Sequence, residues 1–571
     1  MNNTRLFLWM ALFAIGYLLW QAWQTDYHPI ATNGPSATTT TGSVEPAQAS
    51  ADSADDVPKP SSAPTEDGIA AGAETAPETA PSNVPERIIT VATDVLSLRI
   101  DTRGGTLRSA DLLRYPKEAG IRQPTVRILD DTPNTWFVAQ SGLVASRGQA
   151  PSHLAVFTAE RDHYQLTPGS DQLEVPLTWT DPSGITVTKT YLFRRGDYVV
   201  RQRQTVRNDS SAAWSGSAYQ QLQRSAPPPK KGGFSITDPQ QFSFVGAAWY
   251  SPEEKFEKLK FDNFIDEPLQ RPITGGWAAM LQHYFFVAWI PEGDKAVRYS
   301  STVIEPKKIP RYLIRQEEPG FDVAPGASSS TETRLYIGPK LQGNLKDIAP
   351  GLGLALDYGM VRIFAEPLFR FVLNPLHKLT GNWGWAIILT TVLLKLLLYP
   401  LAAAQYRSMG KLRAVQPRME ALKLRYGDDK QKYNQAMMEL YQKEKINPAG
   451  GCLPLLPQMF LFIALYWVLI ESVEMRHAPF MGWLTNLTAH DPYFVLPVLN
   501  ALTMWITQKM TPPPAGMDPM QQKILQYMPL AFSVIMIFFP SGLVLYWTVN
   551  GALGILQQWW IMRQTKAKTA S

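Results

Sequence analysis

The sequence ILQYMPLAFSVIMIFFPSGLVLYWTVNGALGILQQWWI, residues 524–561, runs for thirty-eight residues without an Asp, Glu, Lys or Arg. A transmembrane helix needs about 20 apolar residues, so this stretch is too long for one membrane crossing and long enough for two. Pro540, Ser541 and Gly542 near its middle are residues that favour a turn. The stretch therefore predicts two membrane-spanning helices joined by a tight turn.

Four more stretches have the same character. Residues 6–23, 453–470 and 493–508 carry no charged side chain, and residues 383–404 carry only Lys395. Together with the two helices of the first stretch they predict six membrane crossings. The whole-chain average of 45% hydrophobic residues does not reveal these apolar stretches. The net charge of +5 is also an average over unlike segments, because residues 31–85 alone hold one Lys against eight acids.

The charges between these stretches predict their orientation. The loop 405–452 holds ten Lys and Arg against five acids, and the segment after residue 562 holds three basic residues and no acid. By the positive-inside rule both lie in the cytoplasm, as does the connector that carries Lys509 and Lys523. The loop 471–492, with three acids and one Arg, then lies outside, together with everything between the first two crossings. In a Gram-negative cell that compartment is the periplasm.

The N-terminal stretch has two interpretations. An uncleaved signal anchor fits best, because Trp20 and Trp23 close the apolar run and no small-residue cleavage site follows it. A cleaved signal peptide is the alternative. Residues 31–85 contain no aromatic residue and are rich in Ala, Thr, Ser, Pro and acids, a composition that cannot bury enough apolar surface to fold. They predict a disordered acidic tether.

The region from about residue 88 to residue 336 has the two-residue period of β-strands. In ITVTKTYLF (185–193), the side chains of Ile185, Val187, Tyr191 and Phe193 fall on one face. Residues 198–206 follow a Gly-containing turn as the predicted hairpin partner. Further strands are predicted at 283–290 and 311–315. The single cysteine, Cys452, excludes an intrachain disulfide, so we expect a β-sandwich of ~250 residues held by its core alone.

No catalytic or metal-binding constellation stands out in this region. His153, His163 and His283 lack the spacing to Cys or acids that zinc sites have. A binding or spacing domain is the simplest interpretation. A carbohydrate-binding domain is an alternative that rests on fold analogy alone.

Two further segments have amphipathic patterns. In 352–378, Arg362 and Glu366 are spaced by four beside apolar residues, which predicts a helix on the outer membrane surface or one packed on the β domain. In the basic loop, apolar residues recur at helical spacing on both sides of Gly427, Asp428 and Asp429, which predicts a helical hairpin with its turn and cap there. Its basic surface suits anionic lipids or ribosomal RNA, or serves membrane topology alone.

Lys395 is the only charged residue in the predicted C-terminal crossings. A cation near the middle of a spanning helix costs about 2.5–3.5 kcal/mol, and no other crossing contains an acid to pair with it. It therefore either reaches towards the cytoplasmic headgroups or faces a hydrated cavity, which we favour. An ion-coupled transporter would need titratable acids, and no nucleotide-binding loop is present. Polar residues available to line such a cavity are Thr390, Thr391, Gln458, Asn500, Thr503, Ser533 and Asn550.

Several motifs point to one family. They are GNWGW (381–385), YPL (399–401), QY (405–406), GDDK (427–430), NPAGGCLP (447–454) and FPSGLVLY (539–546). Together they resemble the YidC membrane-protein insertase family over residues 352–565, and the anchor, tether and outer domain resemble its Gram-negative form. The resemblance implies a membrane α-helical core of six transmembrane helices, five of them the insertase core, plus a large periplasmic all-β super-sandwich. It implies no enzymatic activity, cofactor or metal.

The resemblance also implies a mechanism and partners. Nascent inner-membrane proteins would be inserted and helped to fold, alone or with the Sec translocon, through a cytoplasm-facing hydrophilic groove carrying one cation. The ribosome and anionic lipids would be further partners, and no small-molecule substrate is expected. A polytopic solute transporter or channel with an outer sensor domain is the alternative function.

The resemblance assigns residues to this groove. The cation would be Lys395, where the family usually has Arg. Lysine keeps the charge but lacks the two-pronged hydrogen bonding of Arg. Trp547 also departs from the family, which usually has Tyr there. The substrate path would be lined by Thr391, Gln458, Met459, Phe462, Tyr546 and Trp547, with Asn500 and Thr503 as polar candidates on another crossing.

We therefore expect thirteen segments in order. They are the signal anchor 1–24, the tether 25–85, the periplasmic β-sandwich 86–345, the interfacial helix 352–380, a transmembrane helix 381–404, the cytoplasmic hairpin loop 405–451, a transmembrane helix 452–472, the periplasmic loop 473–492, a transmembrane helix 493–509, the cytoplasmic loop 510–523, transmembrane helices 524–540 and 541–562, and the basic cytoplasmic tail 563–571. Both termini would be cytoplasmic and residues 25–380 periplasmic.

Overall fold

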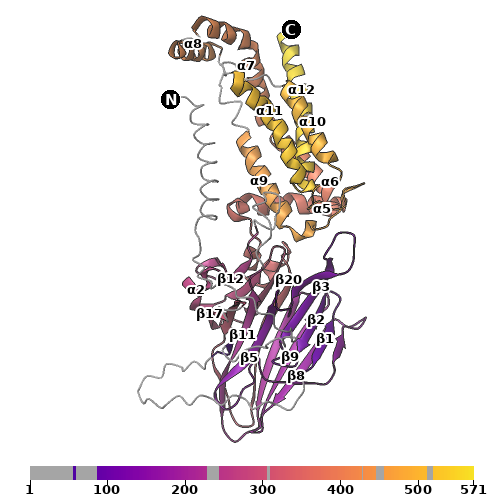
Figure 1. The fold of residues 1–571 in the computed structure, drawn as a ribbon, viewed down its shortest axis with the longest axis vertical. Helices are drawn as coiled ribbons and strands as arrows, with labels where there is room; N and C mark the ends of the chain where they lie inside the picture. The colour runs from indigo at the N-terminus through magenta and orange to yellow at the C-terminus, as the bar shows by residue number, and fades with distance from the viewer. Residues whose placement is uncertain are drawn as a thin grey trace, which may run out of the picture. The chain divides into compact units, whose positions relative to one another are not determined.

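The structure is a computed structural model that describes residues 56–58, 86–227, 243–304, 309–426, 429–444, 455–510 and 519–570. The predicted signal anchor, most of the predicted tether, Gly427, Asp428 and the NPAGGCLP motif lie outside the described residues. The described part consists of a β domain, indigo to magenta in Figure 1, and a group of helices, orange to yellow.

Two sheets form the β domain. Within the described residues one sheet has eleven strands, nine of them in the order β14-β17-β18-β11-β5-β3-β2-β1-β7, with β19 paired to β11 and β4 paired to β3. Their bounds are β14 (Gln270–Thr274), β17 (Ala296–Ile304), β18 (Arg311–Glu317), β11 (Trp214–Ser225), β5 (Phe137–Arg147), β3 (Leu107–Pro116), β2 (Leu96–Asp101), β1 (Ile88–Ala92), β7 (His163–Gln165), β19 (Phe321–Val323) and β4 (Thr125–Leu129).

The second sheet has nine strands in the same described part of the chain, in the order β13-β12-β15-β16-β20-β10-β9-β8-β6. Their bounds are β13 (Lys255–Leu259), β12 (Gly246–Ser251), β15 (Trp277–Leu281), β16 (Phe285–Pro291), β20 (Ser328–Pro339), β10 (Val199–Asn208), β9 (Ile185–Arg194), β8 (Gln172–Thr180) and β6 (Thr158–Ala159). Buried apolar side chains from both sheets belong to one core cluster, as a sandwich requires.

Strand β9 shows how the sequence specifies this sandwich. Its odd-numbered residues from Ile185 to Phe193 are buried and the even-numbered ones between them are half-buried. β10 pairs with it antiparallel, with Thr205 opposite Thr188, so the predicted hairpin is confirmed. The strands predicted at 283–290 and 311–315 are confirmed as β16 and β18.

Lys189 occupies the same buried face of β9 and is fully buried. Its ammonium donates hydrogen bonds to the carbonyls of Gly104, at 2.5 Å, and Ser141, at 2.8 Å. Burial lowers the pKa of Lys189 to about 7. This lysine therefore ties β9 across the core to the opposite sheet instead of facing water.

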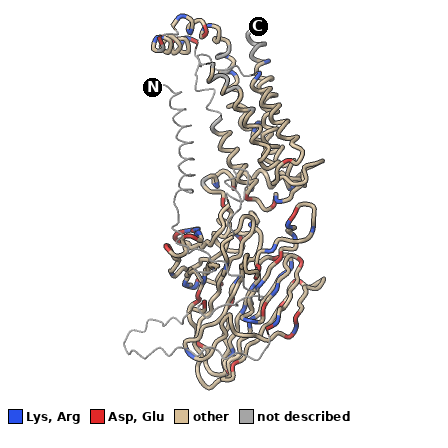
Figure 2. Tube along the Cα trace, in the orientation of Figure 1, with Lys and Arg blue, Asp and Glu red and all other residues tan. Residues whose placement is uncertain are grey.

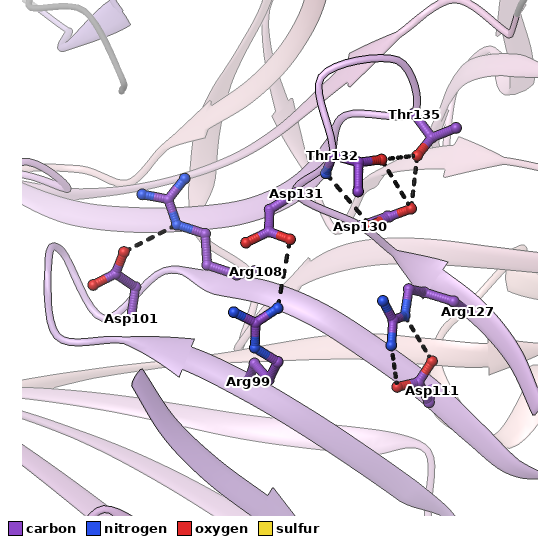
Figure 3. Close-up of polar contacts among 9 residues, drawn as sticks. All are labelled: Arg99, Asp101, Arg108, Asp111, Arg127, Asp130, Asp131, Thr132 and Thr135. Carbon is purple, nitrogen blue, oxygen red and sulfur yellow. Dashed lines mark hydrogen bonds and ion pairs between the residues drawn. The ribbon is translucent and has the colours of Figure 1, made fainter. Parts of the chain in front are cut away.

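Ion pairs join neighbouring strands of the eleven-stranded sheet (Figure 3). The Arg127 guanidinium on β4 donates to both carboxylate oxygens of Asp111 on β3, at 2.8 and 3.1 Å. Arg108 on β3 donates to Asp101 on β2 at 3.1 Å, and both side chains are at least 90% buried. The two-pronged contact fastens β4, which pairs with β3 outside the main order of strands.

The C-terminal part is helical. α6 (Trp383–Leu397) and α10 (Val495–Met510) pack against α12 (Ser541–Ala570), α11 (Pro519–Ile535) packs against α10, and α7 (Tyr399–Tyr426) packs against α8 (Lys430–Lys443). By length and composition, no single helix among the described residues could cross a membrane alone, whereas one pair bent by 63°, Trp383–Leu397 with Tyr399–Ser408, could. The helices are α4 (Arg362–Pro367), the π-helix η5 (Leu368–Leu373), α5 (Asn374–Thr380), α6 (Trp383–Leu397), α7 (Tyr399–Tyr426), α8 (Lys430–Lys443), α9 (Leu455–Glu471), α10 (Val495–Met510), α11 (Pro519–Ile535) and α12 (Ser541–Ala570).

The GNWGW motif builds the start of α6. The Asn382 side chain caps the helix by accepting hydrogen bonds from the backbone N–H groups of Gly384 and Trp385, at 2.9 and 3.3 Å. A Cβ at residue 384 would lie 2.0 Å from the ring of Phe480, so only Gly fits there. The Trp383 ring stacks on His377 with 3.9 Å between ring centroids. The motif thus locks α6 against α5 and the loop after α9.

Hydrogen bonds connect the β domain to the segment after α9. Arg476 donates to the carbonyls of Pro116 and Lys117, at 2.7 and 3.1 Å. The side chain of Gln342 donates to the Ser472 hydroxyl at 2.6 Å. The β domain is therefore held to the helical part by polar contacts as well as by the covalent chain.

Candidate functional site

A small polar cavity lies among α6, α7, α9 and α12. Its volume is about 40 Å³, which is room for only a few water molecules. Both polar and apolar side chains form its walls. It is lined by Thr391, Leu394, Lys395, Leu398, Leu401, Ala402, Gln405, Gln458, Leu461, Tyr546 and Asn550.

Lys395 provides the charge of this cavity. It lies two residues before the end of α6, where the helix axis turns by 63° into α7. In the described residues of α6, α9, α10, α11 and α12, Glu471 is the sole carboxylate. It lies thirteen residues, or ~20 Å of helix, from Gln458, so it is too far away to neutralise the lysine. Figure 2 likewise shows few charged residues along these helices compared with the α7–α8 hairpin.

Lys395 also borders a second, apolar cavity. This cavity has a volume of about 320 Å³. Its other lining residues include Val392, Leu396, Leu556, Trp559 and Trp560. One cation therefore lines both a polar cavity and an apolar one at the junction of α6 and α12.

Contacts to α12 hold this junction. The Gln557 side chain donates a hydrogen bond to the backbone carbonyl of Lys395 at 3.2 Å. A Cβ at Gly554 would lie 3.7 Å from the Lys395 ammonium and 3.8 Å from the Tyr406 hydroxyl. Both distances are ordinary van der Waals contacts, so the ammonium and this hydroxyl lie close beside the backbone of α12.

Five of the residues predicted to line the groove or its cavity meet here: Lys395, Thr391, Gln458, Tyr546 and Asn550. The Phe462 ring lies next to them, with its centroid 6.5 Å from that of Tyr546 and 4.9 Å from that of Trp547. Polar side chains of α6, α9 and α12 and aromatic side chains of α9 and α12 therefore lie near one another at this site.

The other predicted residues lie elsewhere. Met459 is 49% exposed, since it points about 100° around α9 from Gln458. Thr503 donates a hydrogen bond to the Asn500 carbonyl at 2.8 Å and lies against Gly551, which places both residues at the contact of α10 with α12. Asn500 is nevertheless buried, and neither polar atom of its amide has a hydrogen-bond partner among the described residues.

The α7–α8 hairpin has the predicted cap. The Asp429 side chain accepts hydrogen bonds from the N–H groups of Gln431 and Lys432, both at 3.1 Å. Val415 and Met419 of α7 are buried against α8. The turn residues Gly427 and Asp428 lie outside the described residues, so their predicted roles stay predictions.

Comparison with known proteins decides the family. The model described as "YidC periplasmic domain" matches residues 88–371, and the model described as "60Kd inner membrane protein" matches residues 375–568. The membrane protein insertase YidC of Thioalkalivibrio sulfidiphilus is 44% identical over 99% of this chain and 98% of its own length. The chain belongs to the YidC membrane protein insertase family. The YidC of Stenotrophomonas maltophilia (strain R551-3) is 46% identical over 99% of this chain and 97% of its own.

This YidC-family chain is thus an inner-membrane insertase of nascent membrane proteins, with a periplasmic β-sandwich and a C-terminal helical core. Insertion is not an enzymatic reaction. A solved structure described as an active YidC insertase with its first transmembrane domain resolved is 17% identical, with a TM-score of 0.35, over 82% of this chain and 94% of its own.

Sequence reasoning missed one polar residue of the cavity, Gln405. It is ten residues after Lys395, and on one straight helix its side chain would lie ~15 Å further along the axis. The 63° bend between α6 and α7 brings it back to the cavity. The QY motif was the available signal, but its geometry depends on a bend that the apolar pattern does not reveal.

A wider cavity of about 810 Å³ lies in the β domain. Several of its charged wall residues already pair with neighbouring groups. Arg127 binds Asp111, and Arg224 donates to the Leu281 carbonyl at 3.1 Å. These walls hold the strands together, and the carbohydrate-binding interpretation of this domain stays a prediction.

Proposed function

We propose that this chain inserts membrane proteins by receiving the hydrophilic part of a client segment in the cavity at Lys395, from the cytoplasmic side. The observation that carries the proposal is that Lys395 lines both a polar cavity and an apolar one, and that no carboxylate pairs with it in the described part of the chain. The cation and the polar lining would hold an acidic tail, while the apolar cavity would receive the adjoining hydrophobic segment.

Each step of this mechanism follows from ordinary forces. An acidic tail gains a charge contact with the Lys395 ammonium and hydrogen bonds with Gln405 and Gln458. The tail then crosses a shorter apolar barrier than the full bilayer. Burial of the client's apolar segment in lipid drives insertion, and the membrane potential assists the export of an acidic tail.

The cavity must widen for this to happen. A volume of about 40 Å³ holds water but no peptide segment. Separation of α9 from α12 would open it, because Gln458 and Tyr546 lie on these two helices. In this proposal the cavity is the closed form of the groove, and separation of the two helices gives the open form.

The role of the Lys395 charge can be tested in cells that are depleted of the native protein and supplied with variants. We expect Lys395→Ala and Lys395→Leu to lower insertion of a short acidic-tailed client, measured by protease protection, by roughly fivefold or more, because a charge contact of at least ~1 kcal/mol is lost. Lys395→Arg should retain activity. Lys378→Leu, which removes an exposed charge on α5, is the matched control. Wild-type insertion by Lys395→Leu would contradict the proposal.

The α7–α8 hairpin is proposed as the contact for the ribosome. Its support is the basic composition of the loop 405–452 and the exposure of Arg407 and Arg425. Arg425→Glu should reduce cosedimentation with ribosomes. If it reduces only binding to anionic vesicles, the hairpin recognises lipid instead. Cooperation with the Sec translocon is proposed from the family resemblance and is tested by crosslinking in native membranes.

The membrane topology remains a proposal as well. We place both termini in the cytoplasm and residues 25–380 in the periplasm, on the distribution of Lys and Arg between the loops. Single cysteines introduced at positions 430 and 485 of a Cys452→Ser chain should react with an impermeant reagent from the cytoplasmic and periplasmic sides, respectively. The transporter alternative predicts solute flux in reconstituted liposomes without any polypeptide client.

A further inference from the structure

Three residues of the predicted tether lie against the β domain. Asp56 is 1% exposed, Val57 is half-buried and Pro58 is buried. The acidic composition of residues 25–85 predicts a free segment, so this docking corrects the expectation at these three positions. A free aspartate would remain in water, and its burial requires compensating partners.

The Asp56 carboxylate has such partners on both oxygens. Its Oδ1 lies 3.1 Å from Nε2 of His153, which is itself fully buried. Its Oδ2 accepts a hydrogen bond from the Gln223 side-chain amide at 3.4 Å. The guanidinium of Arg315 donates to the Asp56 backbone carbonyl. The pocket therefore binds both the side chain and the main chain of this residue.

A second layer of contacts fixes the imidazole. Nδ1 of His153 lies 2.6 Å from the Tyr219 hydroxyl, which also accepts a hydrogen bond from the His153 backbone N–H at 3.0 Å. A Cβ at residue 142 would lie 2.6 Å from this hydroxyl, so Gly142 makes the room for it. Because a carboxylate can only accept, Nε2 is the nitrogen that presents a proton to Asp56.

The Gln223 amide is fixed in the same way. Its oxygen accepts a hydrogen bond from the Trp136 indole at 2.7 Å, which leaves its NH₂ group for Asp56. Gln223 and Tyr219 both project from β11, and Arg315 projects from the neighbouring β18. The donors thus come from rigid strands whose orientations are set by other contacts.

We propose that this pocket is a binding site for the aspartate side chain of an acidic polypeptide segment, and that Asp56 of the chain's own tether fills it. The aspartate must belong to a polypeptide, since Arg315 binds the main-chain carbonyl. The site is separate from the cavity at Lys395 and does not depend on the mechanism proposed for it.

The docked aspartate divides the tether. The segment 25–85 has 61 residues, whereas only 31 residues lie between the predicted anchor and Asp56. At ~3.5 Å per extended residue, the greatest span from anchor to β domain falls from roughly 210 Å to roughly 110 Å. The site therefore limits how far the periplasmic domain can move from the predicted first membrane crossing.

Competition with a peptide in trans tests the site. The full chain in lipid nanodiscs is titrated with a fluorescent peptide of residues 50–62, SADSADDVPKPSS. The wild-type site is filled in cis at millimolar effective concentration, so Asp56→Ala should bind the peptide at least ~10-fold more tightly than wild type. The peptide carrying Asp56→Asn should lose this binding. Equal affinity of the wild-type and Asp56→Ala chains would overturn the proposal.

A matched control separates the contact from general charge. Asp55→Asn removes the same charge from the adjacent position and should leave peptide binding at the wild-type level. If Asp55→Asn behaved like Asp56→Ala, acidity of the segment rather than the pocket would be responsible, and the proposal would fail.

Hydrogen exchange gives a second measurement on the same full chain. Asp56→Asn, which keeps the size of the side chain, should raise exchange at the His153 amide, and the wild-type peptide should restore protection. Tyr219→Phe combined with Asp56→Ala should weaken peptide binding, because the imidazole loses its orienting hydroxyl. Unchanged exchange in Asp56→Asn would overturn docking of the tether at this pocket.

Discussion

Oε1 of Glu474 accepts a hydrogen bond from the backbone N–H of Gln342 at 2.8 Å, which joins the loop after α9 to the segment that leaves β20. The other carboxylate oxygen is buried and has no hydrogen-bond partner among the described residues. Burial raises the pKa of Glu474 to about 7. The junction between the β domain and the helical core therefore contains a carboxyl group that titrates near neutral pH.

This pKa predicts a pH-dependent stability. A carboxyl whose pKa is raised in the folded state contributes stability that is present below its unfolded pKa of about 4.5 and is lost as pH rises through about 7. We expect wild type to lose on the order of 3 kcal/mol from this group between pH 4.5 and pH 8. Glu474→Gln should remove the contribution of this group to the pH dependence of thermal unfolding followed from pH 5 to pH 8.

Glu366 supplies a control, because its pKa is shifted in the opposite direction to that of Glu474. Burial raises its pKa, but Lys346 and Arg362 outweigh burial and hold that pKa below its usual range. Its contribution is present above the unfolded pKa and is lost only as pH falls through the lower folded value. Glu366→Gln should therefore lower stability by a constant amount between pH 5 and pH 8. A parallel pH profile for wild type and Glu474→Gln would contradict the assignment.

Gly384→Ala should destabilise the helical core. The new methyl group would meet the Phe480 ring at 2.0 Å, and overpacking of this kind costs about 1–3 kcal/mol. Gly410→Ala in α7 is the control, because a Cβ at that position has no heavy atom within 4 Å. It should stabilise α7 by about 0.5–1 kcal/mol through helix propensity. Thermal unfolding of both variants in the same nanodiscs measures the difference.

Gln458→Leu should reduce insertion of clients with acidic tails. The substitution removes a polar group from the Lys395 cavity, and loss of one hydrogen bond worth ~1 kcal/mol gives roughly a fivefold effect. Insertion of a client with an uncharged tail should change little. Met459→Leu, at the exposed neighbouring position, should insert both clients normally. Equal defects in the two variants would show that α9 packing, rather than the cavity, is affected.

Asp429→Ala should fray the start of α8. It removes the acceptor for the N–H groups of Gln431 and Lys432, whereas Asp429→Asn keeps a capping oxygen. Hydrogen exchange at these two amides should accelerate several-fold in the alanine variant and remain near wild type in the asparagine variant. Unchanged exchange in both would mean that tertiary contacts alone hold this end of α8.

Local sequence patterns predicted much of the β domain. The two-residue period identified β9, and the turn after it identified β10, because register in a sandwich follows the buried face. Lys189 was left out of the predicted buried face although the same period includes it. Its burial depends on acceptors at Gly104 and Ser141, which are distant in sequence.

The residues of the Lys395 cavity were partly predictable from the sequence. Charge scarcity singled out Lys395, the polar residues of other crossings added Gln458 and Asn550, and motif resemblance added Tyr546. Asn500 and Thr503 were included as polar residues of a crossing, but which face of a helix meets which neighbour depends on packing. The partnership of Asp56 with His153 was beyond reach, since 97 residues separate them and no short-range pattern links them.

The bend after Leu397 has a mechanical consequence. α7 extends 28 residues from this point, or ~42 Å if it is straight, so it acts as a lever arm whose pivot lies beside Lys395. Each degree of rotation at the pivot displaces the far end at Tyr426 by roughly 0.7 Å. A load placed on the hairpin tip would therefore be transmitted, with reduced amplitude and increased force, to the walls of the polar cavity.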